Sequence, residues 1–348
     1  MSRTHSSLAG LMAVALLLSA CGNQPEPQPQ TDTAESGPER LVVYTSRQPH
    51  LIEPLFDRYS EKTGIDIDYI NDSEAALIER LATEGATTRA DVFMTVDAGN
   101  LWHAAERGLL RPVRSSQLEQ SIPDALRDSR DRWFGLSVRA RTIVYHPERV
   151  DPAELSTYED LADERWAGRL CLRTSQKVYN QSLVAMMIEH HGEQKTESIV
   201  SGWVANLATD PFSSDTRLIE AVEAGQCDVG IVNTYYLGRK IADDPDYPVA
   251  LFWANQETSG VHVNISGAGV TRHAPNPDAA IALLEWLASS EAQAEFAESN
   301  LEFPANPAVE PRGLVRDWGE FRADDTPLPV AGQRQAEAVR LMDRAGYR

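Results

Sequence analysis

Two adjacent tyrosines, Tyr235 and Tyr236, stand where the sequence predicts the end of a buried strand. The strand is the apolar run at residues 227–232, whose weak alternation is typical of a strand buried on both faces of a parallel sheet. Open α/β sheets hold ligands at the carboxyl ends of their strands, so both phenols fall at a candidate site. A phenol can donate a hydrogen bond or stack on a ligand, and a phenolate is a hard oxygen donor for a metal cation. Aromatic residues at strand ends also serve in packing, so the pair alone assigns no function.

The elements around this pair follow an alternating pattern. Leu218, Ile219 and Val222 recur at helical spacing before the strand, and Gly225 stands where a helix C-cap favours left-handed dihedral angles. Nearer the N-terminus, strand and helix patterns alternate as βαβαβ over residues 41–96, which predicts the start of a doubly wound sheet. A second α/β unit follows from about residue 158. This order predicts an α/β protein of two lobes joined by crossing segments.

The composition is that of a globular protein with an acidic surface. The chain has 348 residues, of which 42% are hydrophobic and 24% charged, and its formal net charge is -20. Such a charge argues against nucleic acid and anionic membrane surfaces as partners, and it favours a mild attraction for cations. The sequence contains no GxSxG, HExxH or GxxxxGK motif, so we expect no enzyme.

The N-terminus has the pattern of an export signal. Arg3 supplies a positive start, and residues 8–18 form an apolar stretch that is too short to span a bilayer. Residues 18–22 (Leu-Ser-Ala-Cys-Gly) resemble a lipobox, which predicts a signal peptide at 1–20 and lipid attachment at Cys21. Residues 21–39, rich in Pro, Gln, Glu, Ser and Thr, predict a flexible tether. We therefore expect an exported, membrane-anchored lipoprotein.

Two further cysteines, Cys171 and Cys227, fall in predicted strands of the second unit. An exported chain meets an oxidising compartment, which favours a disulfide between them. Two buried free thiols are the alternative, because the required approach of their Cα atoms cannot be seen in a sequence.

The residues around the tyrosine pair resemble a known family. Asn233-Thr234-Tyr235-Tyr236, after the strand motif Ala-Gly-x-Cys-Asp-Val at 224–229, is similar to the ferric-ion-binding proteins of bacterial iron ABC transporters. Further similar strings occur at residues 44–47 (Tyr-Thr-Ser-Arg), 90–93 (Ala-Asp-Val-Phe), 143–145 (Ile-Val-Tyr), 179–183 (Tyr-Asn-Gln-Ser-Leu) and 303–307 (Phe-Pro-Ala-Asn-Pro). The resemblance implies a two-lobed Venus-flytrap, the type II periplasmic binding protein fold. By this analogy lobe 1 holds residues 40–137 plus 265–348, and lobe 2 holds residues 138–264.

The resemblance also implies a metal site. It carries Tyr145, Tyr235 and Tyr236 over as ligands of Fe(III), and three phenolates would neutralise a trivalent ion. Because a free phenol has a pKa near 10, the metal must displace a proton from each tyrosine, and its affinity should fall with acid.

The contribution of lobe 1 to this metal site is open. Gln48-Pro49 stands where many relatives have His or Tyr, and neither residue is a good ferric ligand. Asp97 lies where some relatives use a carboxylate, which makes it a candidate ligand, but its position also suits a helix N-cap.

Ferric iron with three phenolates needs further oxygen ligands, which in the family often come from an anion such as carbonate. Ser175, Gln176 and Lys177 precede a predicted helix and could present backbone N–H groups to that anion. Asn233 is a second neutral donor for it.

The resemblance implies periplasmic capture of Fe(III) by a monomer that delivers the ion to an ABC permease and its ATPase in the inner membrane. Two alternatives stay open. The same fold could bind an oxyanion or a small organic solute, with the tyrosines as hydrogen-bonding or stacking residues, or the chain could be an exported sensory module.

Overall fold

The computed structural model describes residues 40–348. The predicted signal peptide at 1–20, the tether at 21–39 and the lipidation of Cys21 lie outside these residues. Within residues 40–348, no helix combines the length and the apolar character that crossing a bilayer requires.

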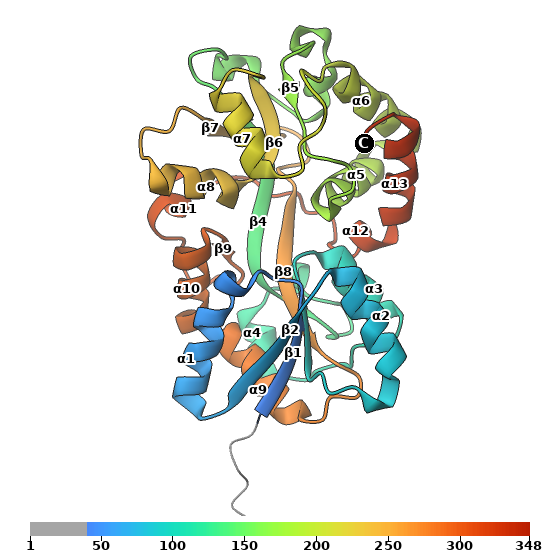
Figure 1. Cartoon of the computed structure of the whole chain (residues 1–348), viewed down its shortest axis with the longest axis vertical. Helices are drawn as coiled ribbons and strands as arrows, with labels where there is room; N and C mark the ends of the chain where they lie inside the picture. The colour runs from blue at the N-terminus through green and yellow to red at the C-terminus, as the bar shows by residue number, and fades with distance from the viewer. Residues whose placement is uncertain (1–39) are drawn as a thin grey trace, which may run out of the picture. The chain divides into compact units, whose positions relative to one another are not determined.

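The first lobe is built on three parallel strands. Its elements are β1 (Arg40–Thr45), α1 (Glu53–Thr63), β2 (Asp66–Asn71), α2 (Glu74–Glu84), β3 (Val92–Thr95), α3 (Ala98–Glu106), α4 (Ser116–Ser121), α9 (Pro277–Leu287) and α10 (Ser290–Asn300). Strand β1 pairs in parallel with β2 on one side and with β3 on the other. This confirms the predicted βαβαβ order, and the lobe occupies the lower half of Figure 1.

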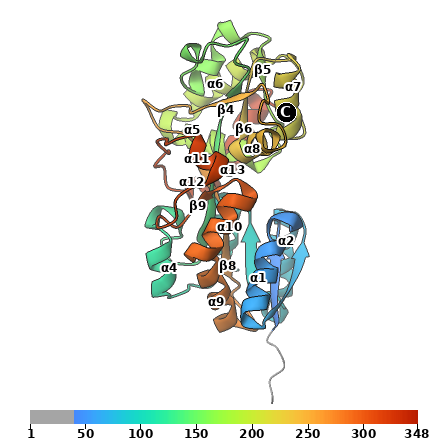
Figure 2. The ribbon, with the colours of Figure 1, turned by 90° about the vertical axis from the view of Figure 1, so that its left-hand side faces the viewer.

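The second lobe carries the tyrosine pair. Its elements are β5 (Leu170–Cys171), α5 (Val178–His191), α6 (Glu193–Ala205), α7 (Asp215–Glu223), β6 (Val229–Asn233), α8 (Thr234–Asp243) and β7 (Ala250–Phe252). Strand β6 is buried along its whole length and pairs in parallel with β5. Figure 2 shows α6 and α7 in this upper lobe and α9 and α10 in the lower one.

Two long antiparallel strands connect the lobes, β4 (Phe134–Tyr145) and β8 (Val263–Val270). The first part of β4 pairs with β8 from Phe134 to Ala140, and its last five residues pair with β6. The strand order across the described sheet is β2-β1-β3-β8-β4-β6-β5, so β8 continues the sheet of lobe 1 and β4 pairs with strands on both sides of the crossing. These crossing strands are the hinge between the lobes.

Short elements fill the connections. They are the 3-10 helices η1 (Pro49–Leu51), η2 (Gly85–Thr87), η3 (Asp124–Leu126), η4 (Pro152–Glu154), η5 (Glu159–Ala162) and η6 (Glu164–Trp166), strand β9 (Phe303–Pro304) and helix α11 (Gly313–Asp317). Strand β9 pairs with β4 beside the hinge.

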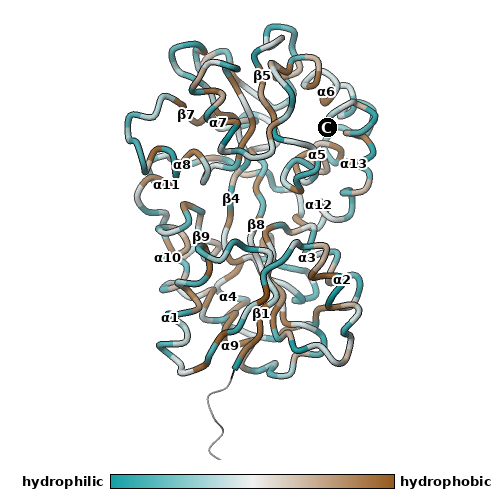
Figure 3. Tube along the Cα trace, viewed as in Figure 1, coloured by the Kyte–Doolittle hydropathy of each residue, from teal (hydrophilic) through white to brown (hydrophobic). Residues whose placement is uncertain are grey.

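Each lobe has its own hydrophobic core. In lobe 1, Val43 and Val92 of the strands pack with Leu283 of α9. In lobe 2, Ile231 of β6 packs in a separate cluster with Leu183 of α5. Figure 3 shows hydrophobic residues along β1 and α9 inside the lower lobe. Separate cores allow each lobe to move as a unit about the crossing strands.

The end of the chain corrects the predicted lobe boundary. Helix α13 (Gln335–Arg344) buries Ala338, Leu341 and Met342 in the core of lobe 2, against α5 and α6. These residues follow a helical i, i+3, i+4 stripe, which finds its apolar partner in lobe 2. The assignment of residues 265–348 to lobe 1 is therefore wrong for this last helix, which Figure 1 shows beside α5.

A short helix, α12 (Val330–Gln333), lies between the lobes. It contacts α3 of lobe 1 and α5 of lobe 2. A Cβ atom added at Gly332 would meet the carbonyl oxygen of Gly99 at 2.9 Å and Cε3 of Trp102 at 2.7 Å. Only a glycine allows α12 to lie this close to α3.

In the structure Cys171 and Cys227 form a disulfide, with their Cα atoms 5.9 Å apart. The bond joins β5 to the residues just before β6 in lobe 2. It encloses the segment that carries α5, α6 and α7.

Candidate functional site

A cavity of about 110 Å³ lies between the two lobes. Its lining residues are Ser46, Arg47, Gln48, Leu51, Val96, Arg139, Arg173, Lys177, Tyr179, Tyr235, Tyr236, Arg239 and Glu302. We call this cavity the cleft. A larger cavity of about 930 Å³ lies mainly against residues 124–129 and 323–329, and none of the described residues that line it is a tyrosine, so the cleft is the candidate site.

Tyr235 and Tyr236 lie in the first turn of α8, directly after β6 ends at Asn233. Their ring centroids are 4.3 Å apart, with a tilt of 35° between the ring planes. The structure therefore brings both phenols to the carboxyl end of β6 and into the cleft.

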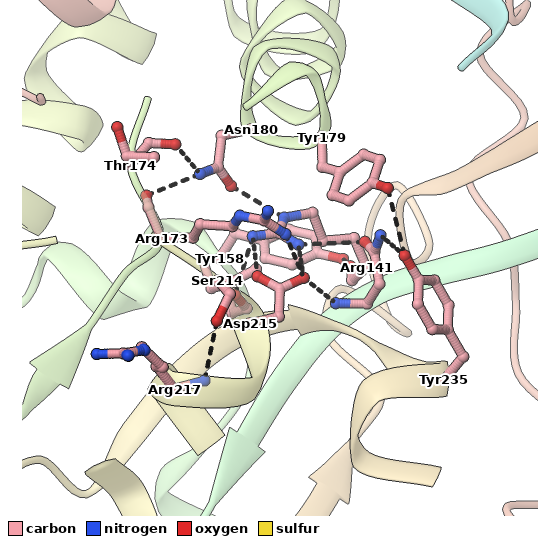
Figure 4. Close-up of polar contacts among 12 residues, drawn as sticks. Arg141, Tyr158, Arg173, Thr174, Tyr179, Asn180, Ser214, Asp215, Arg217 and Tyr235 are labelled. Carbon is pink, nitrogen blue, oxygen red and sulfur yellow. Dashed lines mark hydrogen bonds and ion pairs between the residues drawn. The ribbon is translucent and has the colours of Figure 1, made fainter. Parts of the chain in front are cut away.

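Tyr179 is a third tyrosine in the cleft and was missed as a candidate ligand in the sequence. It is the second residue of α5, and the Tyr235 hydroxyl donates to its hydroxyl oxygen over 3.3 Å. Figure 4 shows the two hydroxyl groups pointing toward one another. One signal in the sequence could have found it: Tyr179, like Tyr235, opens a helix that follows a buried strand.

Tyr145 does not lie in the cleft. It is the last residue of β4 and pairs with Val229, the first residue of β6, whereas Arg141 pairs with Asn233 at the other end. Four strand residues separate the two positions, which is about 13 Å. The Tyr145 side chain packs in the core of lobe 2. The structure thus contradicts the assignment of Tyr145 as a ligand and offers Tyr179 in its place.

Asp97 serves as a helix cap. Its carboxylate accepts from the Gly99 backbone N–H at 2.8 Å, from Ser182 Oγ at 2.8 Å and from Asn264 Nδ2 at 2.8 Å. The side chain is fully buried, and this burial raises the pKa of Asp97 to about 6. Asp97 does not line the cleft. Its oxygens are taken by α3, α5 and β8, so it is not placed to bind a metal there.

The backbone N–H groups of residues 175–177 are engaged within the protein. The Ser175 N–H donates to the Arg348 carbonyl oxygen at 3.2 Å, and those of Gln176 and Lys177 donate to Thr174 at 3.3 Å. They are not free for an anion, which corrects the expectation for this segment. The Lys177 side chain does line the cleft, with Nζ 4.7 Å from the Tyr179 ring centroid.

Asn233 orients a tyrosine. Its Oδ1 accepts from Arg141 Nη1 at 3.1 Å, and its Nδ2 donates to the Tyr235 hydroxyl at 3.4 Å. The amide is buried and does not line the cleft, so its contact is with Tyr235.

Positive side chains surround the three rings. The guanidinium carbon of Arg139 lies 5.2 Å from the Tyr179 centroid, and that of Arg173 lies 5.4 Å from the same ring and 6.0 Å from Tyr236. The guanidinium carbon of Arg239 lies 5.3 Å from Tyr235 and 5.8 Å from Tyr236. Cations at these distances stabilise the electron-rich faces of the rings and, still more, phenolates.

Several of these guanidinium groups keep free donors. In the described part of the chain, Arg139 Nε, Arg173 Nε and Arg239 Nη2 are buried without a hydrogen-bond partner. Buried donors are normally satisfied, so these atoms favour a ligand with acceptor oxygens.

Burial disfavours the charged forms of the Tyr235 and Tyr236 phenols, which raises the pKa of each. Burial raises the pKa of Tyr235 well above its ordinary value, and charge on Tyr179 and Tyr236 would raise it further, while Arg139 opposes both effects. Burial also raises the pKa of Tyr236, which Arg173 lowers. A cation that binds here must therefore displace protons.

Lobe 1 contributes an ion pair to the lining of the cleft. Arg47 Nη2 donates to Glu302 Oε2 at 2.9 Å, and Ser137 Oγ donates to the same oxygen at 2.5 Å. Among residues 40–348, Glu302 is the only carboxylate lining the cleft, and no group of three His, Cys, Asp or Glu side chains could hold a metal. Any metal chemistry in the cleft thus depends on the phenols of lobe 2.

The comparisons with known proteins agree with this architecture. A family model described as bacterial extracellular solute-binding protein matches residues 45–294. Iron uptake protein A1 of Synechocystis sp. is 41% identical over 338 residues, which cover 95% of this chain and 93% of that protein. The similarity therefore extends over both lobes.

Solved structures give the same result. The Trichodesmium protein IdiA (FutA) in complex with iron and citrate ligands has a TM-score of 0.84 and 44% identity, covering 89% of this chain and 100% of that one. The ferric binding protein from Campylobacter jejuni has a TM-score of 0.84 and 34% identity, covering 88% of this chain and 100% of that one. These matches confirm the predicted two-lobed α/β fold. The chain belongs to the bacterial extracellular solute-binding protein family, in the group that includes these ferric-iron-binding proteins.

Proposed function

We propose that this protein captures Fe(III) in the cleft through the phenolates of Tyr179, Tyr235 and Tyr236. The observation that carries the proposal is the meeting of three phenols in one cavity between two lobes, with two of their oxygens 3.3 Å apart. Oxygen ligands about 2 Å from one octahedral ion stand roughly 3 Å apart, so this spacing suits a shared cation. The names of the relatives, iron uptake and ferric iron-binding proteins, support the same cargo.

The chemistry follows from the charges. Three phenolates balance the charge of Fe(III), and the surrounding guanidinium groups stabilise the phenolates as each proton leaves. The protein catalyses no reaction, and binding exchanges protons for metal. Acid reverses the exchange and releases the ion.

An anion accompanies the metal in this proposal. Once the phenolates balance the iron, no carboxylate among residues 40–348 pairs with Arg139 or Arg239, and Arg173 shares Asp215 with Arg141. The free guanidinium donors can bind the oxygens of carbonate or of a small carboxylate while that anion completes the coordination of iron. One relative was solved with iron and citrate ligands, which supports an anion of this class.

The transport role rests on the family. We propose that the chain is exported to the periplasm, is anchored through lipid on Cys21, and delivers iron as a monomer to an ABC permease and its ATPase. The two lobes would close on the loaded ion, since a permease can distinguish the loaded form only if iron binds the closed state better. The Lys177 Nζ atom of lobe 2 already lies 3.9 Å from Glu74 Oε1 of lobe 1.

A visible spectrum tests the metal assignment. Ferric phenolate complexes absorb visible light by charge transfer, so protein loaded with ferric citrate should be coloured and should bleach with a strong chelator. The double variant Tyr235→Phe/Tyr236→Phe should lose the colour and the bound iron while its circular dichroism spectrum stays unchanged. Tight iron binding by this variant would refute the proposal.

The free guanidinium donors also favour a second candidate, an organic anion that binds without metal. Calorimetry separates the two functions. Iron capture predicts strong binding of ferric citrate and weak binding of citrate alone, whereas equal affinities for both would favour the anion.

A further inference from the structure

The hydroxyl group of Tyr347 contacts a residue that lines the cleft. Tyr347 follows α13 and is buried in the core of lobe 2, where 2% of the residue is exposed. Its hydroxyl donates to the Arg173 carbonyl oxygen and accepts from Asn180 Nδ2 at 2.8 Å. Tyr347 does not line the cavity, but Arg173 does. A side chain from the end of the chain thus contacts the segment that lines the site.

Asn180 extends these contacts into a network. Its Nδ2 also donates to the carbonyl oxygens of Arg173 at 2.8 Å and Thr174 at 3.0 Å, and its Oδ1 accepts from Arg141 Nε at 2.9 Å. Arg141 Nη1 in turn donates to Asp215 Oδ2 at 3.0 Å. Figure 4 shows the Asn180 amide above the guanidinium group of Arg141 and the Asp215 carboxylate below it. The Tyr347 hydroxyl completes this network at the backbone of Arg173.

Two residues held by this network, Arg173 and Tyr179, line the cleft. Arg173 carries the guanidinium group that lies over Tyr179 and Tyr236, and Tyr179 is the chain neighbour of Asn180. A shift of the Arg173 backbone or of the start of α5 would therefore move a cation and a phenol together.

We propose that Tyr347 is a positioning residue for the iron site, whose hydroxyl holds Arg173 and Tyr179 in the geometry that binds the metal. The proposal rests on the Fe(III) function proposed above. Tyr347 itself stays outside the coordination sphere and acts through the Arg173 carbonyl oxygen and the Asn180 amide.

Because Tyr347 is buried, one substitution can remove its hydrogen bonds and keep its packing. Burial raises the pKa of Tyr347, against the opposing effects of Arg141 and Arg173, so the hydroxyl remains a donor over the working pH range. Phe fills the same space as Tyr and keeps the packing with α13 and α5. Tyr347→Phe therefore removes the two hydrogen bonds and leaves the apolar contacts in place.

The experiment compares Tyr347→Phe with Tyr44→Phe. Tyr44 is also buried, and its hydroxyl donates to Glu84 at 2.9 Å in lobe 1, away from the cleft. We expect Tyr347→Phe to weaken ferric binding about tenfold, the change that corresponds to loss of one buried hydrogen bond. It should also shift the charge-transfer band and move the midpoint of acid release to higher pH, because Arg173 would stabilise the phenolates less. Tyr44→Phe should change none of the three.

A double-mutant cycle identifies the route. In an Arg173→Met background, the effect of Tyr347→Phe on affinity and on the band should shrink, because the guanidinium group whose position Tyr347 fixes is gone. An undiminished effect would overturn the proposed route through Arg173.

The outcomes separate this inference from the function on which it rests. If the unmodified protein binds iron and Tyr347→Phe matches it in affinity, band and pH midpoint, the positioning role is refuted and the function stands. Equal losses in Tyr347→Phe and Tyr44→Phe would also refute it, as general destabilisation. An unmodified protein that gives no ferric band would refute both.

Discussion

Replacing Tyr179 by Phe is the sharpest test of the site, because the structure puts this residue where the sequence suggested Tyr145. The Tyr179 oxygen lies 3.3 Å from that of Tyr235, so Tyr179→Phe removes one of the converging oxygens and leaves the ring. Tyr145→Phe is the matched control, since Tyr145 packs in the core of lobe 2 and does not line the cleft.

The magnitude follows from the role of each phenol. Residues that only support a metal ligand typically change metal affinity by about 10- to 100-fold, so loss of a direct ligand should exceed roughly 100-fold. That corresponds to more than about 2.7 kcal/mol of binding free energy. Tyr145→Phe should alter affinity by less than about threefold, because its hydroxyl is remote from the cleft.

Competition against a ferric chelator, followed by the visible band, measures both variants under the same conditions. Thermal unfolding of the metal-free proteins controls for folding. A Tyr179→Phe protein with unchanged affinity would refute the assignment of the third ligand, and a large loss in Tyr145→Phe would show that the structural placement of the site is incomplete.

Three further predictions concern acid, charge and the disulfide. Since burial raises the pKa of Tyr235 and Tyr236 and binding displaces their protons, apparent ferric affinity should fall with acid by about tenfold per pH unit for each phenol displaced. A potentiometric slope near three, falling to two in Tyr179→Phe, would support three phenolates, and a flat profile would contradict them. Asp215→Asn should destabilise the metal-free protein by roughly 3–5 kcal/mol in urea, because it leaves Arg141 and Arg173 buried beside a neutral group; stability within about 1 kcal/mol of the unmodified protein would argue against that pairing. Cys171→Ser/Cys227→Ser should cost about 4 kcal/mol, from the loop closed by cysteines 56 residues apart. Insensitivity of the melting temperature to a reductant would count against the bond.

The sequence predicted the elements that carry their own periodicity. The βαβαβ start, the buried strand β6 and the tyrosine pair after it were all visible, because a buried strand and an amphipathic helix have different apolar periods. The pair could be placed at a ligand edge without a structure, since the carboxyl end of a strand is a local feature.

The residues that were misplaced depend on contacts between distant segments. Tyr145 ends a strand, but only its pairing with Val229 reveals that it lies at the wrong end of β6. Tyr179 opens a helix, and nothing local shows that its hydroxyl meets that of Tyr235. The apolar stripe of α13 predicted a helix, but such a stripe does not show which lobe the helix packs against. Strand register and helix docking were the missing information in each case.

The position of α12 gives the protein a contact between its halves in addition to β4 and β8. Gly332 lies against Gly99 with no room for a side chain, and the chain then continues into α13 on the opposite half. Any relative movement of the halves that separates α12 from α3 must break this backbone-to-backbone packing. A side chain larger than hydrogen at position 332 would therefore loosen the connection between the halves without touching the sheet.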